Sequence, residues 1–233
     1  NMMNSFMPYY PPFTQGYDAA MLWLNLDPGY RTAATGGVDN WLNFMKPSDV
    51  FSNTNSTRRP ADNGTHITFD GGDFLRCNVD RLLDTSATGW TVYIRYKEDD
   101  WSDNSTISSD DDSNNYFIKN VGNLLSVKLY NGSSTETENL TFDDPTDLID
   151  DTFTNIAVTC TTGGLLTAYI NGTAQADTET VSATTFDMMY SEVGGKNGAV
   201  WLLTGSIQEV LVWHKPLSAL EVGDVNTYLN NKF

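Results

Sequence analysis

Alternation of apolar and polar residues is the clearest pattern along the chain. In the run 90–97, Trp90, Val92, Ile94 and Tyr96 occupy every second position, which predicts a half-buried β-strand. Shorter runs of similar kind predict further strands over 20–26, 65–69, 73–77, 116–119, 125–129, 156–160 and 166–170. The dipeptides Asn131-Gly132 and Asn171-Gly172 follow two of these runs and are favoured in tight hairpins, because both residue types tolerate positive φ.

The C-terminal part changes character twice. Residues 205–213 become apolar on both faces toward their end, which predicts a central strand that is covered on both sides. Ser218 and Glu221 then form a capping-box signature, and apolar residues recur at helical spacing up to Asn230. Many short strands and one terminal helix predict an all-β protein, an antiparallel two-sheet jelly-roll sandwich with one short C-terminal helix.

The first residues follow neither period. Residues 1–19 are predicted to be an extended arm rich in aromatic residues and proline, and residues 20–233 a single domain. Within the arm, residues 1–17 carry apolar bulk that cannot form a regular element, so this segment is expected to lie either on its own domain or on a neighbouring subunit.

Composition supports the β class. Thr occurs 28 times and Asn 22 times in 233 residues, and these types suit pleated surfaces and turns. The formal charge of −17 argues against binding to nucleic acid or to anionic membrane surfaces, because both would repel the chain. No stretch approaches the roughly 20 apolar residues of a membrane span. Of the two cysteines, Cys160 ends an alternating run, which favours a buried free thiol over a disulfide.

Several ordered pieces resemble the concanavalin A-like lectin/glucanase superfamily, in particular laminin G-like jelly-roll domains. The closing block is similar to the family pattern G-x-I-x-E followed by L-S, E and Y-L-x-x-K, here Gly205, Ile207, Glu209, Leu217, Ser218, Glu221, Tyr228, Leu229 and Lys232. Residues 153–159 and 166–172 resemble the family hairpin W-x-x-V-A-V-T … Y-V-N-G, with Phe153 in place of Trp. Together with pieces near Trp23, Trp41 and Phe69, the resemblance extends over residues 20–233 and implies a two-sheet sandwich.

Signatures of catalysis are not found. Glucanases of this superfamily carry paired carboxylates in a strand of the type E-x-D-x-x-E, and the nearest equivalent is Glu136 and Glu138, which are predicted to flank a turn without the Asp. The two histidines, His66 and His214, are expected to be structural, and no Ser or Cys triad can be assembled around them. The resemblance therefore implies binding or a structural role rather than hydrolysis.

Acidic loops are the candidate metal sites. Twelve of the 30 acidic residues lie in the segments 98–112 and 143–151, and Ca²⁺ prefers oxygen ligands that loops can supply. Relatives with laminin G-like folds hold Ca²⁺ at loop tips, so calcium is the candidate cofactor. The proposed ligands are Asp99, Asp110, Asp112 and Asn114. The alternative is a solvated acidic loop without a metal, and the spacing does not match an EF-hand because Asn115 stands where Gly is required.

Trp101 lies within the first acidic loop, and we expect a glycan site there. An aromatic ring can stack on a pyranose while Asp100, Asp103 and Asn104 bind its hydroxyls. The alternative is that Trp101 folds back onto the sandwich as a lid. The other tryptophans are predicted to lie in the core.

These observations favour a non-enzymatic recognition or decoration protein at a virion surface or in an extracellular location. The expected partners are a glycan or cell-surface polysaccharide, phage capsid or tail proteins contacted through residues 1–17, and a further copy of the chain. The alternative is a secreted carbohydrate-binding module or adhesin domain of a carbohydrate-active protein.

Overall fold

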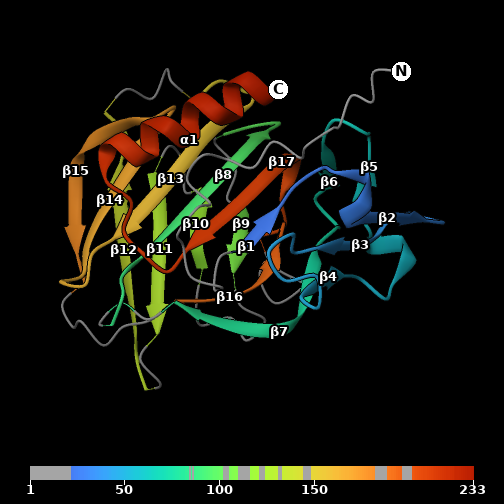
Figure 1. Ribbon diagram of the computed structural model, residues 1–233, viewed down its shortest axis with the longest axis horizontal. Coiled ribbons are helices and arrows are strands. Elements are labelled where there is room, and N and C mark those ends of the chain that lie inside the picture. The colour runs from blue at the N-terminus through green and yellow to red at the C-terminus, as the bar shows by residue number, and fades with distance from the viewer. Residues whose placement is uncertain are drawn as a thin grey trace, which may run out of the picture.

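The structure is a computed structural model that describes residues 22–83, 85, 87–101, 105–109, 116–120, 124–130, 133–143, 148–181, 188–195 and 201–233. The predicted arm, residues 1–19, lies outside these ranges. The described residues form two antiparallel sheets, as the alternation predicts, and one α-helix (Figure 1). The predicted class, an all-β antiparallel sandwich with a short C-terminal helix, is confirmed.

Sheet A contains eight strands among the described residues, in the order β15-β14-β13-β8-β17-β6-β5, with β1 also paired to β17. Its strands are β1 (Leu22–Leu24), β5 (Ala61–Asp62), β6 (Ile67–Asp70), β8 (Trp90–Glu98), β13 (Thr154–Cys160), β14 (Leu165–Ile170), β15 (Thr173–Thr180) and β17 (Thr204–Trp213). Strands β8 and β17 are neighbours near the middle of the sheet, so the most regular sequence patterns occupy its centre.

Sheet B contains nine strands in the described part of the chain, in the order β12-β11-β10-β9-β16-β7-β4-β3-β2. Its strands are β2 (Arg31–Ala34), β3 (Gly37–Leu42), β4 (Val50–Ser52), β7 (Leu75–Leu83), β9 (Thr106–Ser109), β10 (Tyr116–Asn120), β11 (Leu124–Tyr130), β12 (Thr135–Thr141) and β16 (Met188–Val193). Two 3-10 turns, η1 (Pro28–Tyr30) and η2 (Ser56–Arg58), connect strands in the N-terminal half.

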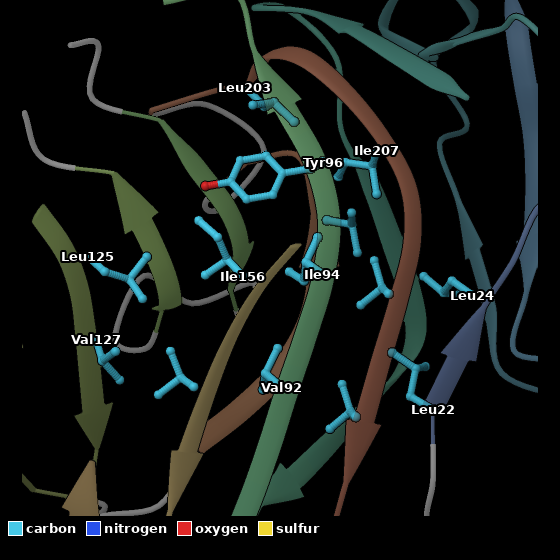
Figure 2. Packing of buried hydrophobic residues seen from close by; sticks show 14 of the residues in the cluster. Leu22, Leu24, Val92, Ile94, Tyr96, Leu125, Val127, Ile156, Leu203 and Ile207 are labelled. Carbon is cyan, nitrogen blue, oxygen red and sulfur yellow. The ribbon is translucent and has the colours of Figure 1, made fainter. Parts of the chain in front are cut away.

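The main core lies between the two sheets. Figure 2 shows Val92, Ile94 and Tyr96 of β8 beside Ile207 of β17, with Leu125 of the opposite sheet among the neighbouring side chains. All five side chains are essentially excluded from water. Because successive strand residues point to opposite faces, the alternating pattern of β8 delivers one apolar face to this core.

The opposite face of sheet A, its outer face, carries a second core. Helix α1 (Ala219–Lys232) lies across this face (Figure 1), and its buried side chains pack on Tyr93, Leu211 and Trp213. The helix begins with the predicted capping box, in which the Ser218 side chain accepts from the Glu221 N–H and the Glu221 side chain reaches back. Strand β17 is therefore buried on both faces, as its sequence predicts.

A buried ion pair ties the end of the helix to the sheet. The pairing of β17 with β8 shifts between Ile207 and Glu209, so one extra residue is accommodated there. Glu209 is fully buried, and its carboxylate accepts from Lys232 Nζ at 2.6 Å and from the Tyr228 hydroxyl at 3.4 Å. Glu209 belongs to the closing strand pattern and Lys232 to the helix pattern, so the ion pair explains why the two patterns occur together.

Some expectations differ from the structure in the polar segments. No strand was predicted between the runs 20–26 and 65–69, yet this part of the chain contains β2, β3, β4 and β5. The polar strands β12 and β15, which form the edges of the two sheets, were also not predicted. Cys77 and Cys160 are both buried and unbridged, and burial raises the pKa of Cys160 to about 12.

No helix among the described residues is both long and apolar enough to cross a membrane.

Removal of the Lys232 charge tests the helix anchor. We expect Lys232→Met to lower the free energy of unfolding by about 3 kcal/mol, because the Glu209 carboxylate would stay buried without its cation. The double variant E209Q/K232M should recover part of this loss. Urea unfolding measures both, with Lys46→Met as the control at a more exposed lysine. Equal stabilities of wild type and K232M would contradict the role of the pair.

Candidate functional site

The strand register brings several loops to one end of the sandwich. Thr204 pairs with Asp70 and Gly205 pairs with Glu98, so the ends of β6 and β8 meet the start of β17. We call the described residues at this end the rim, namely residues 71–74, 99–101, 194–195 and 201–203. The rim thus includes Asp99, Asp100 and Trp101, the described beginning of the predicted glycan loop.

Backbone hydrogen bonds fix the described parts of the rim to one another. The Gly71 N–H donates to the Leu203 carbonyl at 2.9 Å, and the Leu203 N–H donates to the Gly194 carbonyl at 2.9 Å. The Asp99 N–H donates to the Thr204 carbonyl at 3.1 Å. Gly194 has φ +83° and sits so close to the Phe69 ring that a Cβ atom would overlap it. Side chains carried by these segments are therefore held in place.

Trp201 is the exposed aromatic residue of the rim. Its side chain was predicted to lie in the core, and this prediction is wrong, because the residue is 41% exposed. Its backbone has φ +48°, a left-handed conformation that costs a bulky residue about 1–3 kcal/mol. Strain of this kind persists where the surrounding structure imposes it, and it is concentrated at binding sites. The positive φ leaves no signal in the sequence.

Trp101, the predicted platform, faces the core. It is only 2% exposed, its indole N–H donates to the Ile149 carbonyl at 3.0 Å, and its ring contacts Tyr96 edge-on with centroids 5.1 Å apart. The Asp150 carboxylate accepts from the Trp101 backbone N–H at 3.0 Å. The structure thus places Trp101 as a lid, the alternative interpretation, and its ring faces are not available to a sugar.

Only some of the other predicted residues can be located. Asp99 and Asp100 are exposed beside Trp101. Asp103, Asn104, Asp110, Asp112 and Asn114 lie outside the described residues. Within the described ranges, no group of three or more His, Cys, Asp or Glu side chains is arranged to hold a metal ion. Calcium binding by the 98–115 loop remains a prediction.

Carboxylates of the second acidic segment have structural partners. Asp151 pairs with Lys97 at 2.9 Å, and Asp143 accepts from the Ala176 N–H at 2.7 Å. Asp150 holds the Trp101 backbone as described above. These three carboxylates bond to other parts of the chain, so they are engaged before any ligand arrives.

A polar group stands beside the Trp201 segment on the loop after β6. Asp70 accepts from the Gly72 N–H at 2.8 Å, and the buried Asp73 accepts from the Asp70 N–H at 3.3 Å. Burial, and then the nearby Asp70 charge, raise the pKa of Asp73 to about 6. The Arg58 Nε donates to the Gly72 carbonyl at 2.9 Å, and its guanidinium stacks on Phe74 at 4.7 Å. The rim thus combines acceptors and a donor next to an exposed tryptophan.

Glu136 and Glu138 do not flank a turn, which corrects the prediction. Both lie in β12, opposite Leu129 and Val127 of β11, and hence on one face of sheet B. Burial, a hydrogen bond with Glu136 and the charges of Glu136 and Glu179 raise the pKa of Glu138 to about 7. The side chains of Glu136 and Glu138 therefore act on each other.

The architecture defines a class, a two-sheet antiparallel β-sandwich with a helix on one face. A family model described as the Concanavalin A-like lectin/glucanases superfamily matches residues 69–223. The chain belongs to this superfamily, as the sequence resemblance implied. A search of curated proteins finds no match.

Solved structures share the fold at low sequence identity. Trypanosoma rangeli sialidase in complex with sialic acid has a TM-score of 0.60 at 10% identity, over 91% of this chain and 33% of that chain. The binding domain of botulinum neurotoxin DC in complex with rat synaptotagmin II has a TM-score of 0.52 at 17% identity, over 89% of this chain and 51% of that chain. A structure reported for ganglioside-dependent cell entry of botulinum neurotoxin type C has a TM-score of 0.51 at 16% identity, over 89% and 50%. The chain spans a third to a half of these proteins, and at these identities the likeness shows the fold alone.

The two rim tryptophans should respond differently to truncation. We expect Trp101→Ala to lower the free energy of unfolding by about 3–5 kcal/mol, because it leaves a cavity in the core. Trp201→Ala should change it by no more than about 0.5 kcal/mol, because the residue is exposed. Urea unfolding of both variants measures the difference. A larger loss of unfolding free energy in W201A than in W101A would contradict the burial of the Trp101 ring and the exposure of the Trp201 ring.

Asp73 should make stability depend on pH. Its pKa in the folded protein, about 6, lies above the ordinary value of 3.8, so the folded state holds a proton that the unfolded chain has lost. The contribution of Asp73 is then complete below pH 3.8 and is lost as the pH rises through about 6. Unfolding free energies measured between pH 4 and pH 7 should fall less with rising pH in Asp73→Asn. Parallel curves for the two proteins would contradict this.

Proposed function

We propose that the protein is a non-enzymatic carbohydrate-binding module and that its rim binds the glycan, with Trp201 as the stacking platform. The observation that carries this proposal is the exposure of Trp201 in a left-handed backbone conformation, on a segment held by backbone hydrogen bonds. Backbone strain at a large, exposed ring is typical of residues that bind a ligand.

The chemistry of the rim suits a sugar. The face of an indole ring packs on the apolar face of a pyranose, while its hydroxyls need acceptors and donors nearby. The hydrogen bond from Gly71 to Leu203 brings the turn that bears Asp70 and Asp73 beside the Trp201 segment. Asp70 can accept from hydroxyls, and Arg58 of η2, which is hydrogen-bonded to this turn, can donate.

Known proteins of this fold support a glycan as ligand. The Trypanosoma rangeli sialidase structure contains sialic acid, and the neurotoxin type C study names two ganglioside molecules. Both ligands are carbohydrates or carry them. Transfer of a ligand class across 10–16% identity is part of the proposal.

The carboxylates favour binding over hydrolysis. Hydrolysing pairs of carboxyl groups stand roughly 5 to 9.5 Å apart so that a sugar and, in inverting enzymes, a water fit between them. Glu136 and Glu138 lie two residues apart in β12 and lack the Asp of the glucanase strand pattern. A reducing-sugar assay tests this part of the proposal, because turnover that is lost on removal of one carboxylate would overturn it.

The setting of the module is a further proposal. We propose a virion surface, as a phage capsid-decoration or tail-associated protein, with residues 1–17 contacting the larger assembly. The secreted module or adhesin domain remains the alternative. Copurification of the protein with virus particles would support the virion setting. Recovery of the protein free in the medium, and attachment to particles that is unchanged after deletion of residues 1–17, would contradict it.

Glycan binding should depend on Trp201. On a glycan array, we expect Trp201→Ala to weaken binding of the wild-type ligands at least about tenfold, because the stacking surface is lost. The matched control is Leu220→Ala, which removes another exposed apolar side chain, 76% exposed, from the helix that follows the opposite end of β17. Unchanged binding by W201A would overturn the site.

The same array tests the proposed calcium requirement. Binding measured with added Ca²⁺ and with a chelator should differ if the 98–115 loop holds the ion, and the chelator should also lower the melting temperature. Equal binding and equal melting temperatures would contradict a calcium site.

A further inference from the structure

The outer face of sheet A is only partly covered by helix α1. On strand β8, Tyr93 packs under the helix, whereas Arg95 and Lys97 continue the same face beyond the apolar contact. On β17, Leu211 belongs to the same covered cluster, whereas Ser206 stands opposite Lys97. The face therefore changes from an apolar half under the helix to a polar half beside it.

Arg95 is the centre of the polar half, and its hydrogen bonds go to neutral groups. Its Nε donates to Gln208 Oε1 at 2.7 Å, and one terminal nitrogen donates to Asn155 Oδ1 at 3.0 Å and to Asn230 Oδ1 at 3.1 Å. No carboxylate of the described residues forms an ion pair with it, and its second terminal nitrogen makes no hydrogen bond within those residues. In a chain of net charge −17, this guanidinium is half-buried without a paired anion.

The surrounding structure holds Arg95 in this state. Because of the irregular register in β17, Gln208 and Glu209 both lie near Arg95. Glu209, the nearby carboxylate, is instead bonded to Lys232 and Tyr228 of the helix. Gln208 is fixed in turn, because its Nε2 donates to the Thr65 carbonyl at 3.1 Å. The guanidinium is thus oriented by amides, while the acid beside it is bonded elsewhere.

Aromatic rings flank the guanidinium. Its central carbon lies 5.9 Å from the Phe153 ring centroid and 5.7 Å from that of Phe233. Lys97 Nζ lies 5.8 Å from the Phe153 centroid, and the His66 ring lies 5.7 Å from it on another side. Phe153 is half-buried and Phe233 is 41% exposed, so apolar surface and positive charge alternate along this part of the face.

We propose that this face is a second ligand site, separate from the rim, which binds a saccharide that carries a carboxylate, of the uronic acid type. The second terminal nitrogen of Arg95 would pair with the sugar carboxylate, and Phe153 would contact the apolar face of the sugar ring. Hydroxyls would meet Ser206 and Thr68, whose side chains already share a hydrogen bond at 3.1 Å.

The strand pairing favours a compact saccharide over a peptide. Strand β8 is paired with β13 on one side and with β17 on the other, so an added peptide strand would find no free backbone edge there. Recognition must therefore come from side chains alone. The neutral amides and hydroxyls around Arg95 are suited to sugar hydroxyls, and the guanidinium supplies the selectivity for an acid.

The test is isothermal titration of the whole protein with a galacturonic acid oligosaccharide and with the matched neutral galactose oligosaccharide. We expect binding of the acidic sugar only, weakened at least tenfold in Arg95→Gln and less in Arg95→Lys, which keeps the charge. If R95Q folds poorly, Lys97→Met serves as the second variant, and it should also weaken binding because it removes the other cation of this half of the face. Melting temperatures of all variants identify losses caused by unfolding.

Three results would overturn the proposal. These are equal binding of the acidic and neutral sugars, equal binding by wild type and folded R95Q, and tighter binding of a poly-glutamate peptide than of the uronic acid oligosaccharide. W201A should retain the acidic sugar, so failure of the rim site and failure of this site are distinguishable.

Discussion

The fold depends on one strand that is buried on both faces. Strand β17 packs Ile207 and Val210 against sheet B and Leu211 and Trp213 against helix α1, so neither face can be exposed without loss of a core. The helix must therefore be held on the sheet, and the buried pair of Glu209 and Lys232 does this at its last turn. The same irregularity in β17 that accommodates Glu209 also directs Gln208 to Arg95. Helix docking and the polar half of the outer face thus arise from one feature of one strand.

Strands that bury one face could be predicted from the sequence, whereas exposed edge strands could not. Strands with an apolar face, such as β8 and β13, were predicted within one or two residues, as 90–97 and 156–160, because burial imposes a period of two. The closing family pattern has a structural reason at two of its positions, since a Cβ atom at residue 205 would overlap the Lys97 carbonyl and Glu209 binds the helix. The edge strands β12 and β15 were missed because edges are exposed, and Thr and Glu there carry no apolar alternation.

The site was harder to predict than the fold. Trp101 and Trp201 both lie in loops, and their neighbours in sequence do not reveal which ring is buried. Trp101 is held inward by Ile149 and Asp150, residues some 50 positions away. The acidic loops also proved partly structural, because Asp143, Asp150 and Asp151 bond to other parts of the chain. The negative charge therefore stabilises loop positions as well as the protein in solution, and the cations left without a paired anion become the informative groups.

The central claim is that glycan recognition takes place at the rim and uses Trp201 rather than Trp101. The most direct measurement is an NMR titration of ¹⁵N-labelled protein with an array-selected glycan, following the indole N–H resonances of the six tryptophans. The Trp201 resonance should shift with glycan concentration, whereas the Trp101 indole, bonded to Ile149, should stay unchanged and exchange slowly with solvent. A shift of Trp101 with an unaffected Trp201 would contradict the account.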